Sequence, residues 1–198
     1  MMLAHSLKPG LLMFAAALLA WPAQAAHVLA PIMLVATPQM RHAIYGNSVV
    51  LVLPMGEDRH IGFIINRPTD RKLGQLFPEH EPSKKVPDPV FYGGPSVSKM
   101  VFAIVNRSDN PGGMSLEVAR GLFAIFDGAT VDRMIESESD HARFFTGLVT
   151  WQPGELAQEI NRGLWYVAKP DANVVLRKPT QGLWEEMVSR LRVAQGTI

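Results

Sequence analysis

The stretch HIGFIINRP, residues 60–68, is a run of apolar residues that ends in two polar residues and a proline. A short run of this kind, rich in β-branched and aromatic residues, is typical of a strand covered on both faces. Pro68 biases Arg67 toward an extended backbone, so we expect the Arg67 guanidinium to project from the end of the strand. The segment therefore predicts a sheet that is buried on two sides.

Similar apolar runs recur along the chain between turn residues. They predict further strands over residues 29–36, 48–53, 100–106, 122–127, 142–150 and 164–168, besides the one over residues 60–66. Apolar residues at helical spacing predict helices after Thr130, after Pro153 and from Leu183, and a single helical turn that ends at Pro78. Strands and helices do not alternate strictly, so we expect an α+β fold with a mixed sheet and helices packed on it.

The segment PEHEPSKKVPDP, residues 78–89, contains four prolines. Prolines at this density disrupt the backbone hydrogen bonds of helices and strands. We therefore expect an exposed, locally extended loop that adds no regular element to the core. The segment is too short to separate two domains, and residues 26–198 are expected to form one domain.

The N-terminus has the three parts of a bacterial-type secretory signal: Lys8, the apolar run LLMFAAALLA over residues 11–20, and the pattern Ala23-Gln24-Ala25. The run is about half the roughly 20 residues needed to span a bilayer core. We expect residues 1–25 to be a signal peptide cleaved after Ala25, which predicts a periplasmic or secreted protein with no membrane span after cleavage. The alternatives are an uncleaved membrane anchor and an N-terminal extension from a misassigned start codon.

The composition excludes several function classes. The 198 residues contain no cysteine, so there is no disulfide framework, thiolate metal site, thiol nucleophile or lipidation site. The chain has 19 basic and 18 acidic residues, and removal of residues 1–25 takes away Lys8 and no acid, which leaves a formally neutral protein. Nothing in this balance supplies the excess of positive charge that nucleic-acid binding requires.

Two motifs follow predicted strands. Asn66-Arg67-Pro68 places an arginine where it could clamp a carboxylate or phosphate, and the alternative is a structural arginine that pairs with an acid or caps carbonyls. Gly93 and Gly94, between Tyr92 and Pro95, permit close backbone approaches and could cradle a phosphate. Pro95 removes an N–H donor there, and the pattern matches no known phosphate loop, which favours a tight turn or bulge.

A third motif, WQPGEL over residues 151–156, begins a predicted helix that carries Glu155 and Glu159 on one face. Two neighbouring carboxylates could divide the acid and base roles of an enzyme if burial separated their pKa values. The alternative is a solvated helix face on which Glu155 is favoured by the helix dipole. Trp151 and Trp165 would then line the core or the wall of a pocket.

Other catalytic and metal signatures are weak. No two of His27, His42, His60, His80 and His141 have the spacing of a helical metal pair, so the sequence predicts no metal site unless folding brings ligands together. No nucleophile elbow or cofactor motif occurs, which disfavours a serine hydrolase and predicts no cofactor.

These segments, in this order, resemble the YqgE/AlgH family of bacterial proteins. The matching pieces are LVATP (34–38) with SVV (48–50), GFIINRP (62–68), YGGP (92–95), FTG (145–147), WQPGEL (151–156), EI (159–160), GLW (163–165) and Trp184. The resemblance implies the fold of that family, a bifurcated mixed sheet that curls into a pseudo-barrel with flanking helices. It implies no established reaction, and the transcriptional-regulator label of some members reports an effect on exopolysaccharide regulation.

The chain departs from the family pattern at several positions. Members usually differ at Pro54, Met55, Arg59, His60, Glu155 and Ala157. The resemblance also implies a cytoplasmic protein, because members typically lack a secretory signal. Because the chain differs at these six positions, the resemblance implies no function that uses them.

Three hypotheses follow. The first is a non-enzymatic regulatory or ligand-binding protein for a small molecule or protein partner, with a pocket formed by Asn66, Arg67, Gly93, Gly94, Trp151, Glu155 and Glu159. The second is a hydrolase-class enzyme that uses Glu155 and Glu159 for acid–base work. The third is a DNA-binding transcriptional regulator, which the neutral mature charge and the export signal argue against. The sequence does not indicate an oligomeric state.

Overall fold

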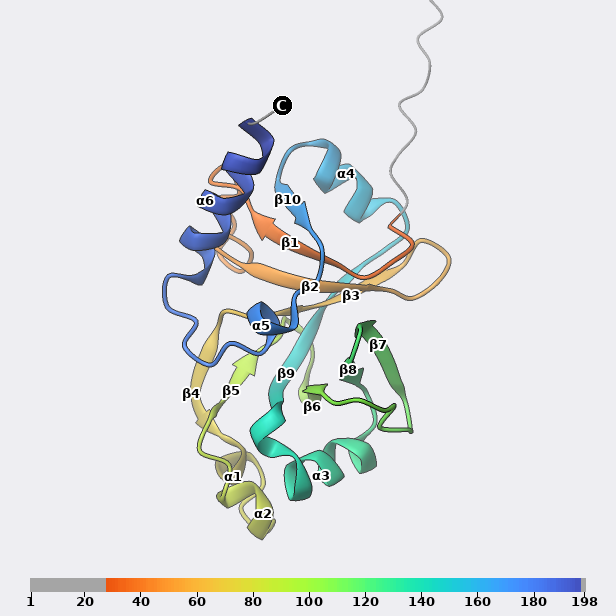
Figure 1. The fold of residues 1–198 in the computed structure, drawn as a ribbon, viewed down its shortest axis with the longest axis vertical. Helices are drawn as coiled ribbons and strands as arrows, with labels where there is room; N and C mark the ends of the chain where they lie inside the picture. The colour runs from red at the N-terminus through yellow and green to blue at the C-terminus, as the bar shows by residue number, and fades with distance from the viewer. Residues whose placement is uncertain (1–27, 197–198) are drawn as a thin grey trace, which may run out of the picture.

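The computed structural model describes residues 28–196, which form ten strands joined into one sheet with helices packed on it (Figure 1). The strands are β1 (Ile32–Ala36), β2 (Val49–Pro54), β3 (His60–Ile64), β4 (Pro68–Lys72), β5 (Pro89–Tyr92), β6 (Ser96–Asn106), β7 (Ser115–Ala119), β8 (Leu122–Ile125), β9 (Ala142–Trp151) and β10 (Trp165–Ala168). The helices are α1 (Leu73–Leu76), α2 (Glu81–Lys84), α3 (Gly128–Ser137), the 3₁₀ turn η1 (Ser139–His141), α4 (Glu155–Asn161), α5 (Ala172–Val175) and α6 (Leu183–Gly196).

The sheet runs in the order β10-β1-β2-β3-β9-β6-β8-β7, and β9 is the strand on which it divides. β6 lies along β9 in antiparallel register, from Ala142 to Leu148. The opposite edge of β9 pairs first with β5, in parallel at Phe145 and Thr146, and then with β3, in antiparallel register at Val149 to Trp151. In Figure 1, β9 therefore connects the upper part of the molecule, with β1 to β3 and α4, to the lower part, with α3.

Three glycines make this division possible. A Cβ atom on Gly93 would lie 2.2 Å from the carbonyl oxygen of Gly147, and one on Gly147 would lie 2.2 Å from that of Gly94. Gly147 also has a φ of +69°, in the left-handed region that side chains rarely adopt. The chain that follows β5 can therefore cross β9 at backbone contact only because these positions carry no side chain.

Side chains on both faces of the sheet are buried in apolar clusters. Phe63 of β3 packs against Phe102 of β6 and Phe145 of β9, with ring centroids 5.7 and 5.3 Å apart, in a cluster that α5 and α6 cover. The opposite faces pack against α4 at one end, through Leu156, and against α3 at the other, through Val131. Burial on both faces explains why the strands appear in the sequence as continuous apolar runs.

The structure confirms the predicted α+β class with a mixed sheet and flanking helices, and all seven predicted strands are present. β4, β5 and β7 were not predicted. Helix α3 begins earlier than expected, because the Asp127 carboxylate, rather than Thr130, caps it by accepting a hydrogen bond from the Thr130 N–H at 2.9 Å. Helix α4 begins after Pro153, with Gly154 as its N-cap.

Much of the segment over residues 78–89 is exposed, as predicted, but the prediction that it adds no regular element was wrong. The segment contains α2, in which Pro82 occupies one of the first positions, where its missing N–H has no helical partner to lose. Ser83 and Val86 are buried, and α2 contacts both α1 and α3. The proline-rich segment therefore contains a short helix, and the segment packs on the core through Ser83 and Val86.

The predicted signal peptide lies outside the described residues and stays a prediction. Among residues 28–196, no helix is long and apolar enough to cross a membrane.

We predict that Gly93→Ala destabilises the protein by about 3 kcal/mol, because the new methyl group must displace backbone atoms of β9 rather than a flexible side chain. Gly128→Ala is the matched control, since a Cβ atom there meets nothing within 4 Å and the change should alter stability by no more than about 1 kcal/mol. Urea unfolding of both variants measures the difference. Equal midpoints would contradict a close crossing of the two strands.

Candidate functional site

A cleft opens beside α4, where the end of β9 meets the loop between β1 and β2. We call it the α4 cleft; its volume is about 300 Å³, and its lining residues are Tyr45, Val149, Thr150, Trp151, Glu155, Gln158, Glu159 and Arg162. It contains three of the residues predicted from the sequence, Trp151, Glu155 and Glu159. Most of its other lining side chains are polar, which suits a hydrophilic ligand better than an apolar one.

The carboxylate of Glu159 is held by two indole groups. Trp151 Nε1 donates to Glu159 Oε2 at 3.0 Å, and Trp165 Nε1 donates to the same oxygen at 2.8 Å. Both tryptophans are 5% exposed, so these bonds form at the edge of the apolar core. Hydrogen bonds to a charged acceptor are stronger than neutral ones, and two rigid donors fix the direction in which the carboxylate faces.

Glu155 occupies the first turn of α4, and its Oε2 accepts a hydrogen bond from the Gln152 N–H at 2.8 Å. The Gly154 N–H donates to Asp58 Oδ2 at 2.8 Å, which ties the start of the helix to the turn between β2 and β3. Gly154 has a φ of +82°, a conformation that glycine adopts without strain. The turn before α4 thus places both carboxylates on the side of the helix that borders the cleft.

Tyr45, from the loop between β1 and β2, also lines the α4 cleft. Burial raises the pKa of its phenol, and electrostatic interactions with Glu159, Tyr92 and Glu155 raise it further. A phenolate is disfavoured there because it would add a negative charge to a site that already has two carboxylates. Arg162 also lines the cleft, so the lining carries two negative charges and one positive charge, and this excess of negative charge favours cationic groups.

Asn66 and Arg67 hold the loop that carries Tyr45. Asn66 Oδ1 accepts from the Val49 N–H at 2.9 Å, and its Nδ2 donates to the Asn47 carbonyl at 2.9 Å. Arg67 Nη2 donates to the Gly46 carbonyl at 2.9 Å. Neither residue lines the cleft, so both position its wall through the backbone.

The structure places Gly93 and Gly94 at the strand crossing, against Gly147 and Leu148, and not along the cleft. Of the seven predicted residues, it brings together Trp151, Glu155 and Glu159, and links Asn66 and Arg67 to them through the loop. Their assignment to a ligand site stays a prediction. The sequence analysis did not identify Tyr45, Thr150, Gln158 or Arg162; Gln158 and Arg162 have helical spacing from Glu155, whereas Tyr45 has no local signal.

The sequence predicted no metal ligands, but folding brings one set together. Within residues 28–196, His80, Asp132 and Glu136 form the single group of three or more potential ligand side chains that lie close enough to hold one ion. The group lies near α2 and α3, at the end of the molecule opposite to α4 in Figure 1.

Comparisons with known proteins agree with this fold. The sequence pattern of the family described as AlgH-like matches residues 33–195. The UPF0301 protein SCO2948 of Streptomyces coelicolor is 30% identical over 169 residues, which cover 81% of this chain and 85% of that protein. A UPF0301 protein of Bacteroides thetaiotaomicron is 26% identical over 168 residues, 80% of each chain.

Two solved structures have the same fold. The crystal structure of protein DIP2367 from Corynebacterium diphtheriae superposes with a TM-score of 0.69 at 24% identity, covering 84% of this chain and 89% of that one. The solution structure of the AlgH protein from Pseudomonas aeruginosa gives a TM-score of 0.67 at 19% identity, covering 85% and 92%. The predicted fold, a mixed sheet that curls into a pseudo-barrel, is thereby confirmed, and the sheet forms a half-barrel. The names of these proteins assign no reaction or ligand.

We predict that Glu159→Gln lowers the pKa of Tyr45, because it removes the charge that raises this pKa most, while a side-chain oxygen remains to accept from the two indoles. ¹³C NMR of ring-labelled tyrosines, titrated with base, measures the change. Glu155→Gln should lower the pKa less, since Glu155 contributes less than Glu159. An unchanged Tyr45 titration in Glu159→Gln would show that the two groups do not share a site.

Proposed function

This chain belongs to the AlgH-like family, and we propose that it is a non-enzymatic regulatory protein that binds a small cationic molecule in the α4 cleft. The ligand class is an ammonium or guanidinium compound with hydrogen-bonding groups in its body. The observation that carries the proposal is the fixed carboxylate of Glu159.

The charge and shape of the cleft support a cation. Glu159 and Glu155 supply two carboxylates against the single guanidinium of Arg162, so the lining has an excess of negative charge. Charge-assisted hydrogen bonds from an amine to a preoriented carboxylate are among the stronger polar contacts in proteins. Thr150, Gln158 and Arg162 surround this centre with side chains that can bind hydroxyl or carbonyl groups of the ligand body. A volume of about 300 Å³ suits a small metabolite.

A hydrolase that uses Glu155 and Glu159 has less support. Each carboxylate already accepts hydrogen bonds from its own protein, Glu155 from the Gln152 N–H in the turn before α4 and Glu159 from two indoles. These bonds orient the carboxylates and occupy one oxygen of each, which a general acid or base would otherwise present to a substrate. The cleft lining includes neither histidine nor serine. Duplex DNA binding is also disfavoured, because two carboxylates border the cleft and the mature chain is formally neutral.

We predict that at least one compound from a set of polyamines, amino sugars and basic amino acids raises the melting temperature of the wild type. A ligand at a hundredfold excess over its Kd stabilises by about 2.7 kcal/mol, and each kcal/mol is roughly 2–4 °C for a chain of this size. Glu159→Gln should abolish the shift, whereas Glu185→Gln, an exposed position on α6, should retain it. A set in which no compound acts, or acts equally on Glu159→Gln, would overturn the proposal.

We further propose that the chain is exported and works in the periplasm, on the basis of the signal-like segment over residues 1–25. N-terminal sequencing of the protein in an osmotic-shock fraction is expected to begin at Ala26. Recovery of intact Met1 in the cytoplasmic fraction alone would contradict export and would return the chain to the compartment that the family resemblance implies.

A further inference from the structure

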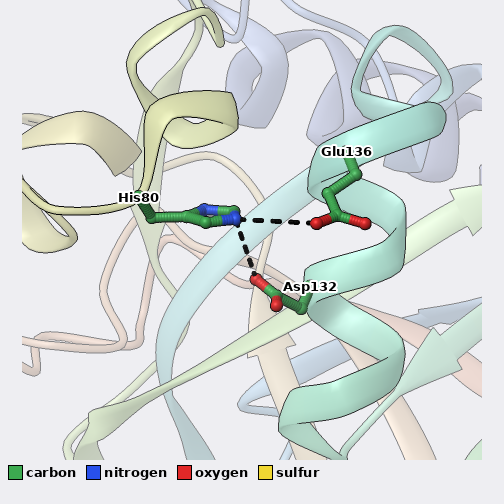
Figure 2. A group of neighbouring side chains, drawn as sticks. All are labelled: His80, Asp132 and Glu136. Carbon is green, nitrogen blue, oxygen red and sulfur yellow. Dashed lines mark ion pairs between the residues drawn. The ribbon is translucent and has the colours of Figure 1, made fainter.

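His80, Asp132 and Glu136 converge between α2 and α3, outside the α4 cleft. Figure 2 shows the His80 ring directed at both carboxylates, which rise from successive turns of α3. His80 is the N-cap residue of α2, so the contact between the two helices brings the imidazole to the face of α3. The side chains are 27%, 58% and 54% exposed, which leaves them accessible from solvent.

The distances leave a gap of the size of an ion. His80 Nε2 lies 3.5 Å from Asp132 Oδ1 and 3.9 Å from Glu136 Oε1, at or beyond the limit of a hydrogen bond. The three potential ligand atoms all lie within 4.8 Å of one another. Ligand atoms around a tetrahedral Zn²⁺, at about 2.0–2.2 Å from the metal, are roughly 3.3–3.6 Å apart. Small rotations of exposed side chains are therefore enough to close the group around one ion.

A buried serine orients the imidazole. His80 Nδ1 lies 2.8 Å from Ser83 Oγ, and Ser83 is 0% exposed. When Nδ1 carries the proton and donates to Ser83, the Nε2 lone pair faces the two carboxylates. An outer partner that fixes the tautomer in this way is a regular feature of histidine metal ligands.

Three electron-rich groups directed at one point favour a cation between them. Lys99 lines a neighbouring hollow with His80 and Asp132, but it forms no ion pair with either carboxylate within the 4.0 Å limit, among the residues that the structure describes. The hollow has a volume of about 440 Å³ and is otherwise mostly apolar, with Phe77 and Ile135 in its wall. It leaves one side of the group open to water and to an entering ion.

We propose that His80, Asp132 and Glu136 bind one divalent transition-metal ion of the Zn²⁺ class, with water in its remaining positions. One imidazole and two carboxylates suit Zn²⁺, Co²⁺ or Mn²⁺, whereas Ca²⁺ and Mg²⁺ prefer sites made of oxygen ligands alone. Such a donor set with open positions is the arrangement of catalytic or exchangeable metal sites rather than of closed structural ones.

The test is calorimetric titration of the tag-free, metal-stripped chain with ZnCl₂, and separately with CoCl₂ while the visible spectrum is recorded. We expect one ion per chain and a cobalt absorption band. His80→Ala, and the double variant Asp132→Asn with Glu136→Gln, should each lose the site, whereas His141→Ala, an exposed histidine on η1, should bind as the wild type does. Absence of binding to the wild type, or equal binding by these variants, would overturn the proposal.

Ser83→Ala tests the orientation of the ring. Loss of an outer partner of this kind weakens metal binding by about 10–100-fold, so the variant should still bind one ion but with a Kd at least tenfold higher. If His80→Ala proves unstable without metal, Asp132→Asn alone decides the question, because its side chain is exposed on α3 and its loss need not disturb folding. The amine response of the α4 cleft should be unchanged in all of these variants, which separates this site from the proposed function.

Discussion

The whole architecture depends on the close backbone contact between the chain after β5 and the middle of β9. Gly93, Gly94 and Gly147 bring these segments together at distances that no side chain permits. One edge of β9 can then pair with β5 over its first half and with β3 over its second half. The sheet divides and curls at this point, so that it has helices at both ends, and the two sites described above lie at these opposite ends (Figure 1).

Near α4, the fold fixes the orientation of the Glu159 carboxylate. β9 ends at Trp151 and β10 begins at Trp165, and the two indoles donate to the same oxygen of Glu159. The loop that carries Tyr45 also borders the cleft, held by Asn66 and Arg67 through backbone carbonyls and amides. Asn66 and Arg67 therefore help to place the loop that borders the cleft, and their predicted contact with a ligand stays a prediction.

Much of the fold could be predicted because it follows from local patterns. Continuous apolar runs identify strands that are buried on both faces, whereas β4 is mostly exposed and polar and has no such signal. The helix α2 was missed because Pro82 looks like a helix breaker, although proline is compatible with a first helical turn.

Functional sites are harder to predict from the sequence than strands and helices, because Tyr45 and His80 reach their partners only through long-range packing. The buried Arg143 is a similar case. Its Nη1 donates to the Ile65 carbonyl at 3.0 Å, and its guanidinium lies over the Phe91 ring. No sequence pattern predicts either contact.

One carboxylate, shared by two buried indoles, is the central feature of the α4 cleft. The most direct measurement is ¹⁵N–¹H NMR of the indole N–H groups while the pH is lowered through the range in which carboxylates titrate. The resonances of Trp151 and Trp165 should shift together with one midpoint, while that of Trp184, which donates to the Ala36 carbonyl, should remain in place. Independent midpoints, or no shift in either indole, would contradict the shared carboxylate.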